Sequence, residues 1–280
     1  MAGRRRAAAP GKGAALSAAR RILVLAPHPD DEIVACGVAA CRAAADGARI
    51  SVLYLTTGVP PREALWPWRR ARYPSLVARR RGEALAAAAL FGLSPAGFLD
   101  IPSRRLIAHL GQAAAAVDRA LDETAADRLW VTAFEGAHQD HDAANALAAR
   151  FRDRLPVWEF AAYNHAGGRV RSNRFHDARG GVVELRLDRA EAAQKRRALA
   201  LYASERGNLM HIRTAEEACR PLPRHDYAAP PHPGTLFRER FHWVPFRHPR
   251  VDFTPSAEVY AALGRWHAAQ ALDIAPAAEG

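Results

Sequence analysis

The stretch that most constrains this chain is residues 22–37, which read ILVLAPHPDDEIVACG. Ile22 to Leu25 form a short apolar run that ends at Pro27, a pattern typical of a buried parallel strand. A helical pattern follows over residues 33–38. The polar residues between them therefore lie at the carboxyl end of a strand and the amino end of a helix, where open α/β folds place their binding sites.

The polar residues of this stretch are His28, Asp30, Asp31 and Glu32. Any one of the acids could serve only as a helix cap or a first-turn charge. A histidine and several carboxylates crowded on one strand end repel one another unless a cation or shared protons relieve them. The group as a whole therefore indicates a functional site rather than a cap.

A second polar cluster, AFEGAHQDHDAAN at residues 133–145, repeats this arrangement. It follows a predicted strand at 128–132 and precedes a predicted helix at about 142–152, and it contains His138, Asp140, His141 and Asp142. Right-handed crossovers bring the two clusters together at one edge of the same sheet. Ordinary loop histidines are the alternative, but two separate clusters with the same placement favour a shared site.

The rest of the chain alternates between strand and helix patterns. Strands are predicted at 49–55, 97–101, 157–163 and 181–187, and helices at 31–46, 76–92, 105–124, from the last strand to about 203, and at 256–271. We expect an α/β fold with a Rossmann-like, mostly parallel sheet, helices on both faces, and an irregular C-terminal extension. Residues 21–280 are long enough for one domain, with a loop-rich segment at 204–255 on the substrate side. Residues 1–20 are expected to be a disordered basic tail.

Residues 59–75 contain four prolines and two tryptophans, Trp66 and Trp68, and predict a long irregular loop. Such a loop is either a lid or substrate wall, or a segment whose tryptophans cover the core. The arginines of this loop would suit an anionic sugar conjugate, such as one linked to a nucleotide or lipid phosphate. They are Arg62, Arg69, Arg70 and Arg72.

Composition excludes several function classes. The net charge is +11, but Lys12 and Lys195 are the only lysines, and no aromatic and basic module for stacking bases is present, so we expect no nucleic-acid partner. No run of about 18 apolar residues predicts a transmembrane segment, and the N-terminus is not a signal peptide. Cys36, Cys41 and Cys219 cannot all pair, which favours core positions in a reducing cytoplasm.

Together the two clusters offer two histidines and one carboxylate, a ligand set that leaves open positions on zinc or a similar divalent ion. Such an ion lowers the pKa of water to ~7 and polarises a carbonyl. A carboxylate that is not a ligand can then accept a proton, and another can fix the tautomer of a ligand histidine. The residues alone do not decide whether Asp30 or Asp31 binds the metal.

Two strings resemble a known family. Residues 26–32, APHPDDE, are similar to the (A)HPDDE signature of the LmbE-like or PIG-L zinc N-deacetylases, and residues 138–141, HQDH, to their HxDH signature. This family includes the N-acetylglucosaminyl-phosphatidylinositol deacetylases. The pair, in this order and about 110 residues apart, is specific, and the similarity covers about residues 20–150.

The resemblance implies a zinc-dependent N-deacetylase that releases acetate from an N-acetylglucosamine-type conjugate. By position, it implies that His28, Asp31 and His141 hold one Zn2+ per chain, with Fe2+ as an alternative metal. It also implies that Asp30 is the general base. His138 would stabilise the oxyanion or protonate the leaving amine, with Asp140 orienting it. Arg80 matches a substrate-contacting arginine of the family; a solvated helix face is the alternative for it.

The sequence departs from the family at the substrate wall. Gly136 stands where some members carry a tyrosine, and a late Lys-Ala-His-Ser-Gln pattern is only echoed, by Lys195, Ala198, Tyr202, Ser204 and Glu205. Other functions therefore remain open: an amidase for a longer acyl group or another amide, a phosphoesterase, and a non-catalytic basic binding module.

Overall fold

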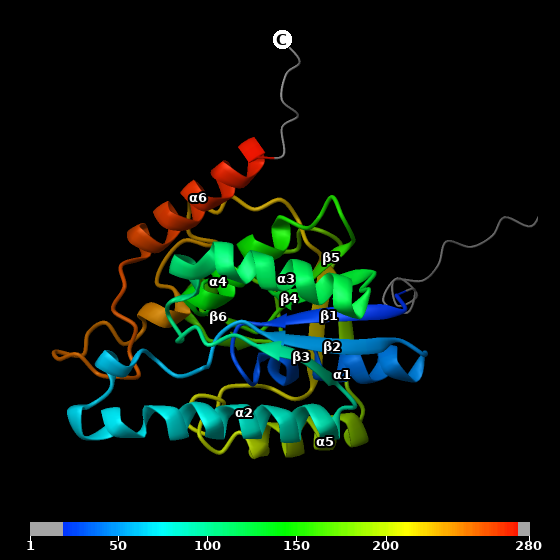
Figure 1. Ribbon diagram of the computed structural model, residues 1–280, viewed down its shortest axis with the longest axis horizontal. Coiled ribbons are helices and arrows are strands. Elements are labelled where there is room, and N and C mark those ends of the chain that lie inside the picture. Colours follow the sequence, from blue (N-terminus) through cyan, green and yellow to red (C-terminus); the bar gives the residue numbers. More distant parts are fainter. Residues whose placement is uncertain (1–18, 274–280) are drawn as a thin grey trace, which may run out of the picture.

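The computed structural model describes residues 19–273 (Figure 1). The expected N-terminal tail therefore lies outside the described residues, apart from Ala19 and Arg20. Ala19 is buried, and the backbone N–H of Arg20 donates to the carboxylate of Asp127 at 3.0 Å. These two residues of the expected tail are therefore held at the N-terminal end of the first strand.

A seven-stranded sheet forms the centre of the fold, in the order β3-β2-β1-β4-β5-β9-β8. The first five strands of this order run parallel, and β9 and β8 continue the sheet antiparallel. The strands are β1 (Arg21–Ala26), β2 (Arg49–Tyr54), β3 (Ser94–Phe98), β4 (Arg128–Thr132), β5 (Val157–Phe160), β8 (Val183–Arg186) and β9 (Glu216–Pro221). A separate two-stranded sheet pairs β6 (Tyr163–Asn164) with β7 (Arg171–Ser172). The expected Rossmann-like, mostly parallel sheet is confirmed.

Helices cover both faces of this sheet, as predicted. The core on one face contains residues of α3 (Leu110–Thr124), α4 (Gln139–Ala149) and α6 (Ser256–Asp273). The core on the other face contains residues of α1 (Asp31–Ala45), α2 (Tyr73–Leu90) and α5 (Arg189–Leu201). Figure 1 shows these two layers above and below the sheet. Among the described residues, no helix has both the length and the apolar character needed to cross a bilayer.

Strand β1 is the point where the order of strands reverses. It pairs with β2 on one side, with Leu25 opposite Leu53, and with β4 on the other, with Leu25 opposite Val131. A crevice forms outside the carboxyl ends of parallel strands at such a switch point. The helices α1 and α4 begin immediately after β1 and β4, so both polar clusters lie at this crevice.

Strand β3 spans Ser94–Phe98 rather than the predicted 97–101. Two further differences from the predicted strands have identifiable reasons. Strand β5 ends at Phe160, before the expected 163, because the backbone N–H groups of Ala162 and Tyr163 donate to the buried Glu135 carboxylate at 2.7 and 2.9 Å. Strand β9 was not predicted, since its sequence EEACRP carries no alternating apolar pattern. Its charged side chains Glu217 and Arg220 are fully buried because each has a buried partner of opposite charge.

The loop after β2 contains two short 3-10 turns, η1 (Arg62–Ala64) and η2 (Pro67–Arg72). Trp68 is 73% exposed, so it does not cover the core. The segment between β9 and α6, which includes η5 (Phe237–Glu239), lies on the same side of the molecule as η2, at the left of Figure 1. The ring of His248 meets that of Trp66 edge to face, with centroids 5.9 Å apart.

Candidate metal centre and active site

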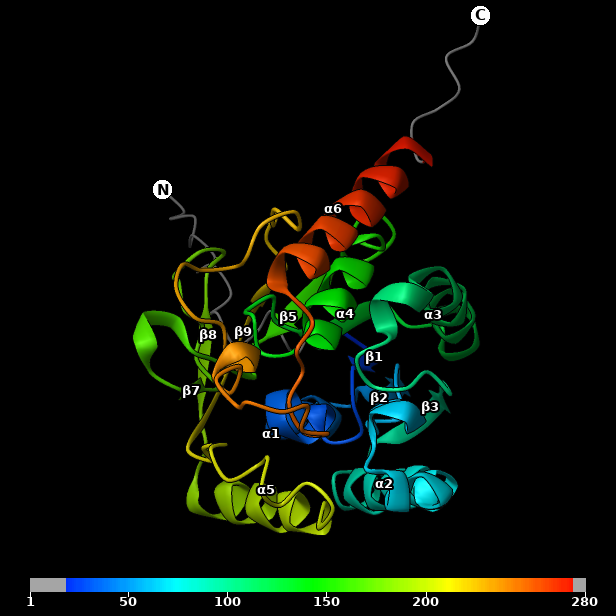
Figure 2. The same cartoon turned by 90° about the vertical axis from the view of Figure 1, so that its left-hand side faces the viewer.

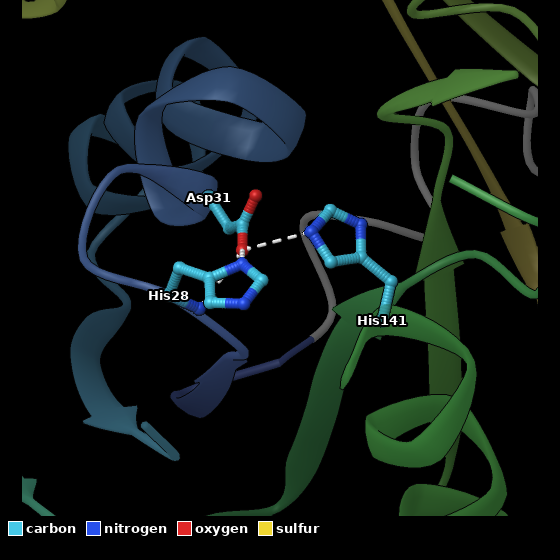
Figure 3. A group of neighbouring side chains, drawn as sticks. All are labelled: His28, Asp31 and His141. Atoms are coloured by element: carbon cyan, nitrogen blue, oxygen red, sulfur yellow. Dashed lines mark hydrogen bonds and ion pairs between the residues drawn. The ribbon is translucent and has the colours of Figure 1, made fainter. Parts of the chain in front are cut away.

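Three predicted metal ligands meet at the switch point. A single oxygen, Asp31 Oδ2, lies 3.1 Å from His28 Nδ1 and 3.1 Å from His141 Nε2. Figure 3 shows the carboxylate between the two imidazole rings, which come from the loop after β1 and from the first turn of α4. All three side chains are buried, and their ligand atoms lie within 4.8 Å of one another. Tertiary structure therefore joins the two sequence clusters into one group.

The burial and the missing hydrogen bonds of His141 are what a metal ligand would show. Its side chain is fully buried, and neither of its ring nitrogens has a hydrogen-bond partner of good geometry among residues 19–273. A buried imidazole whose nitrogens make no well-oriented hydrogen bond is costly unless a ligand completes it. Two imidazole nitrogens and one carboxylate oxygen are donors that zinc and similar divalent ions accept. The residues present thus suit a divalent metal ion.

Asp140 supports His28 from the other side of the ring. Its Oδ2 lies 2.9 Å from His28 Nε2, and it also accepts from the Ser103 hydroxyl at 3.2 Å and the Arg104 backbone N–H at 2.6 Å. A carboxylate bonded to the second nitrogen of a ligand histidine fixes its tautomer and orientation. Burial opposes a charge on His28, yet its bonds to Asp140 and Asp31 raise the pKa of His28 to about 10.

Asp140 was expected to orient His138, but its carboxylate lies closer to His28. Asp140 Oδ2 is 3.5 Å from His138 Nδ1, farther than from His28. His138 Nδ1 instead accepts from the Asp140 backbone N–H at 3.1 Å, so His138 is the N-cap of α4. This cap also explains why the helix begins at Gln139 rather than at the predicted 142.

His138 lies beside the trio and faces the surface more than the ligands do. Its ring meets that of His28 at right angles with centroids 4.5 Å apart, and 20% of its side chain is exposed. Burial lowers the pKa of His138 to about 3, and the charge of His28 lowers it further. In this arrangement His138 is a neutral imidazole at the edge of the site.

Asp30, the predicted base, adopts a strained backbone at the start of α1, with φ 144°. Such conformations cost of order 1–3 kcal/mol and cluster at active sites. Its Oδ2 accepts from Arg80 Nη2 at 3.1 Å rather than contacting the histidines. Burial raises the pKa of Asp30 to about 7, although Arg80 opposes this rise.

Arg80 is 3% exposed, so the alternative of a solvated helix face does not hold. Its guanidinium lies 3.7 Å from Glu205 as well as contacting Asp30, and it lies over the ring of Tyr202. Tyr202 in turn donates a hydrogen bond to Glu32. Arg80 is therefore placed to orient Asp30, the residue next to the candidate ligand Asp31.

Helix α1 is broken at Cys36, where φ is −141° and ψ is 16°. The carbonyl of Val34 accepts from Lys195 Nζ at 2.9 Å, and the N–H groups of Val38 and Ala39 donate to the Glu217 carboxylate at 3.0 and 2.8 Å. Lys195 and Glu217 also form a fully buried ion pair of 2.7 Å. This pair, from α5 and β9, replaces the helical hydrogen bonds and holds the end of α1 that carries the acids.

Sequence reasoning missed several residues around the site. Ser103 contacts His28 and Asp140, and Asp252 accepts from Gln139 Nε2 at 2.7 Å. The ring of Tyr163 packs against that of His141 with centroids 5.4 Å apart. None of these residues belongs to a motif, so only the fold could reveal them.

Comparisons with known proteins came from three directions. Residues 23–151 match the family model described as PIG-L, GlcNAc-PI de-N-acetylase. This range contains both clusters and the complete trio of candidate ligands. No curated protein matched the chain.

Solved structures share the fold. A deacetylase of the teicoplanin biosynthesis pathway aligns with a TM-score of 0.57 at 19% identity, over 72% of this chain and 97% of its own. The zinc-inhibited form of teicoplanin deacetylase Orf2 aligns with a TM-score of 0.54 at 20% identity, over 72% and 97%. The 4-carboxy-2-hydroxymuconate hydratase GalB of Pseudomonas putida aligns with a TM-score of 0.52 at 17% identity, over 74% and 98%.

At these identities the structural likeness shows a common α/β fold, and the hydratase shows that this fold serves more than one reaction. The evidence for the family is the match of residues 23–151 to the family model, and these residues include the HPDDE and HQDH strings. Residues 23–151 of this chain therefore match the PIG-L (LmbE-like) family.

Proposed function

We propose that this protein is a metal-dependent hydrolase that removes the N-acetyl group from an N-acetylglucosamine-type sugar conjugate, releasing acetate and a free amine. The observation that carries this proposal is the buried trio His28, Asp31 and His141 with a separate carboxylate, Asp30, beside it. A two-histidine, one-carboxylate set leaves open positions, and a free base next to it suits hydrolysis. The family description and the two teicoplanin deacetylases support the reaction class.

His28, Asp31 and His141 would hold one divalent ion, for which Zn2+ is our first choice and Fe2+ the alternative. When bound there, such an ion would lower the pKa of water and polarise the amide carbonyl. Asp140 and Ser103 keep the His28 ring in place through its far nitrogen. The protein supplies this geometry before any substrate arrives.

Asp30 is the proposed general base. It accepts the proton of the attacking water as the oxygen adds to the amide carbon, and Arg80 holds the carboxylate in position at 3.1 Å. A pKa of about 7 matches a base that works near neutral pH. The same proton leaves with the amine nitrogen when the carbon–nitrogen bond breaks.

His138 is the proposed contact to the developing oxyanion or to the leaving nitrogen. It is the most exposed histidine of the cluster, and it lies against the ring of His28. Preorganised donors at an oxyanion are worth about 10²- to 10³-fold in turnover.

Two broader expectations stay part of this proposal. We propose that residues 21–280 act as one domain, because β9 and β8 extend the same sheet that carries the site. We also propose a cytoplasmic location, because Cys36, Cys41 and Cys219 are all free thiols.

The test is to measure metal content and acetate release together, for the wild type and for Asp30→Asn, with a panel of N-acetylglucosamine conjugates. We expect about one equivalent of metal in both proteins, acetate from the wild type, and a loss of roughly a thousandfold or more in turnover in the variant. Asparagine keeps the shape of the side chain but replaces the carboxylate by a neutral amide that cannot accept the proton, so retained metal shows that the site still folds.

Other outcomes would redirect or reject the proposal. A metal-loaded protein that releases a longer acid, or phosphate, would be an amidase for another acyl group or a phosphoesterase. Hydration of an unsaturated acid would place it beside the hydratase that shares its fold. Absence of metal from both proteins would leave only a non-catalytic module and contradict the enzyme function.

A further inference from the structure

A cavity of about 240 Å³ lies between two segments that are far apart in the sequence. Its walls come from the end of the loop after β2 and from the segment before α6: Leu65, Trp66, Arg69, His248, Pro249 and Arg250. In Figure 2 the orange segment that contains the latter residues runs toward the start of α6. No residue of this cavity takes part in the chemistry proposed above.

The cavity is tied to the catalytic residues through a few hydrogen bonds. The carbonyls of Pro249 and Val251 accept from the Arg104 guanidinium at 2.8 and 3.2 Å, and the Arg104 backbone N–H donates to Asp140. Asp252, two residues after Arg250, accepts from Gln139. These hydrogen bonds hold one wall of the cavity to Asp140 and Gln139, which flank the trio.

The donors that line the cavity suit an anion. Arg69 and Arg250 are exposed, and neither has a carboxylate partner in the described part of the chain. Arg70, in the same turn, behaves differently, since its guanidinium donates to the backbone carbonyls of Leu65 and Glu63. Two guanidinium groups without carboxylate partners at one cavity can bind a phosphate, because arginine forms bidentate hydrogen bonds with phosphate oxygens.

His248 adds a third donor. Its Nδ1 accepts from the Arg250 backbone N–H at 3.1 Å, so a neutral ring carries its proton on Nε2. The indole of Trp66 forms a second wall, stacked on Trp68 with centroids 5.3 Å apart and planes within 3°. The cavity thus combines three positive or N–H donors with a rigid aromatic surface.

We propose that this cavity is a phosphate subsite, which binds a phosphate or diphosphate group attached to the N-acetyl sugar. The proposal rests on the function proposed above and narrows its substrate to a phosphorylated conjugate. It also assigns the role to particular residues, since Arg69 and Arg250 line the cavity whereas Arg70 is occupied by the backbone. Arg250 and His248 come from a segment that no charge pattern had connected with the loop after β2.

The kinetic test compares N-acetylglucosamine 1-phosphate with the neutral methyl glycoside of N-acetylglucosamine. For the wild type we expect kcat/KM to favour the phosphorylated sugar by about tenfold or more, since one charge-assisted hydrogen bond is worth roughly that factor. In Arg69→Gln and in Arg250→Gln this ratio should fall by about tenfold, mainly through KM. Arg49→Gln makes the same charge change at the opposite, amino-terminal end of β2 and should keep the wild-type ratio.

A binding measurement separates this proposal from the proposed function. Glucose 1-phosphate has no amide and can be titrated calorimetrically into the metal-loaded protein, with glucose as the neutral control. Binding that is weakened about tenfold in Arg69→Gln and Arg250→Gln supports the subsite even if no conjugate releases acetate. Two results together would overturn the phosphate subsite: equal turnover of both sugars, and an affinity for glucose 1-phosphate that is unchanged in Arg69→Gln and Arg250→Gln. The proposed deacetylase function would not be affected by them.

The same phosphate occurs in soluble and in lipid-linked sugars, and two further substrates distinguish them. One is uridine diphosphate N-acetylglucosamine, and the other is N-acetylglucosamine phosphate carrying a long alkyl chain in phosphatidylcholine vesicles. A preference for either, lost in Arg69→Gln, supports the subsite and identifies the source of the phosphate. Sensitivity of neither substrate to Arg69→Gln would contradict it.

Discussion

Helices α1 and α4 both begin in the candidate site, directly after the adjacent parallel strands β1 and β4, yet their backbones differ. Helix α4 starts from an extended His138 that caps it, and it continues regularly to Ala149. Helix α1 starts at Asp30 with φ 144° and is interrupted at Cys36. The backbone of α4 is held by its own helical hydrogen bonds and its cap, whereas the broken backbone of α1 needs side chains from distant residues.

That support comes from outside the family match at residues 23–151. Lys195, Glu217 and Asn173 bind the backbone groups that the break in α1 leaves free, and Tyr202 binds Glu32. The helix ends that carry the chemistry therefore depend unequally on the C-terminal part of the chain. The following predictions test this difference, from the largest expected effect to the smallest.

Lys195→Met should cause the largest loss. It leaves Glu217 charged and unpaired in a fully buried position, which costs about 3–5 kcal/mol. For a chain of this size that corresponds to a fall of roughly 10 °C in Tm, measured by thermal unfolding.

Two controls accompany Lys195→Met. Arg154→Met removes exposed ion pairs with Asp118 and Asp122 and should cost less than about 1 kcal/mol. Adding Glu217→Gln to Lys195→Met should cost less than the sum of the single changes, because no buried charge is then left alone. Equal stabilities of Lys195→Met and Arg154→Met would show that the buried Lys195–Glu217 pair is not needed to stabilise α1.

Asp140→Asn should weaken metal binding by about 10- to 100-fold. The carboxylate fixes the His28 ring from behind, and loss of such a partner typically has this effect. Competition with a chelator measures the affinity. Unchanged affinity with reduced turnover would mean that Asp140 acts through His138, as the family resemblance implied.

Tyr163→Phe should reduce kcat by up to about tenfold with metal content unchanged. The ring packs against His141, and the hydroxyl forms no hydrogen bond within residues 19–273, so it is free to bind substrate. Steady-state kinetics on the best conjugate measure the change. Wild-type kinetics in this variant would restrict Tyr163 to packing.

Gly136→Ala should have the smallest effect, about 1 kcal/mol in the free energy of unfolding. Gly136 has φ +68°, and a Cβ there would lie 2.8 Å from Leu236 Cδ2. Gly234→Ala is the matched control, because Gly234 has φ +82° but open space around its Cβ position. Denaturant unfolding should therefore show a smaller loss for Gly234→Ala; equal losses would mean that Leu236 moves aside freely.

The contact with Leu236 also explains the departure of this chain from relatives that carry a tyrosine at the position of Gly136. Leu236 occupies the space into which a side chain would project. An aromatic hydroxyl near the trio instead comes from Tyr163, whose backbone is held by Glu135. Burial raises the pKa of Glu135 to about 8 even though it accepts these hydrogen bonds.

Local sequence determined much of this protein. The apolar run before Pro27, the helical pattern after it, and the repeat of that arrangement at 133–145 were sufficient to predict a parallel α/β sheet and the meeting of the two polar clusters at one edge. The choice of Asp31 over Asp30 came from the family resemblance. Strand and helix periodicity is written into neighbouring residues, and topology rules then bring strand ends together.

Tertiary structure alone decided the rest. It inserted β9 antiparallel beside β5, buried Arg80 against Asp30, placed Asp140 behind His28, and brought Arg250 to Arg69. Each of these joins residues at least 50 positions apart, and the burial of β9 also depends on partners for its charged side chains. Their pairing follows from packing and from the need to satisfy buried polar groups, which no local pattern records.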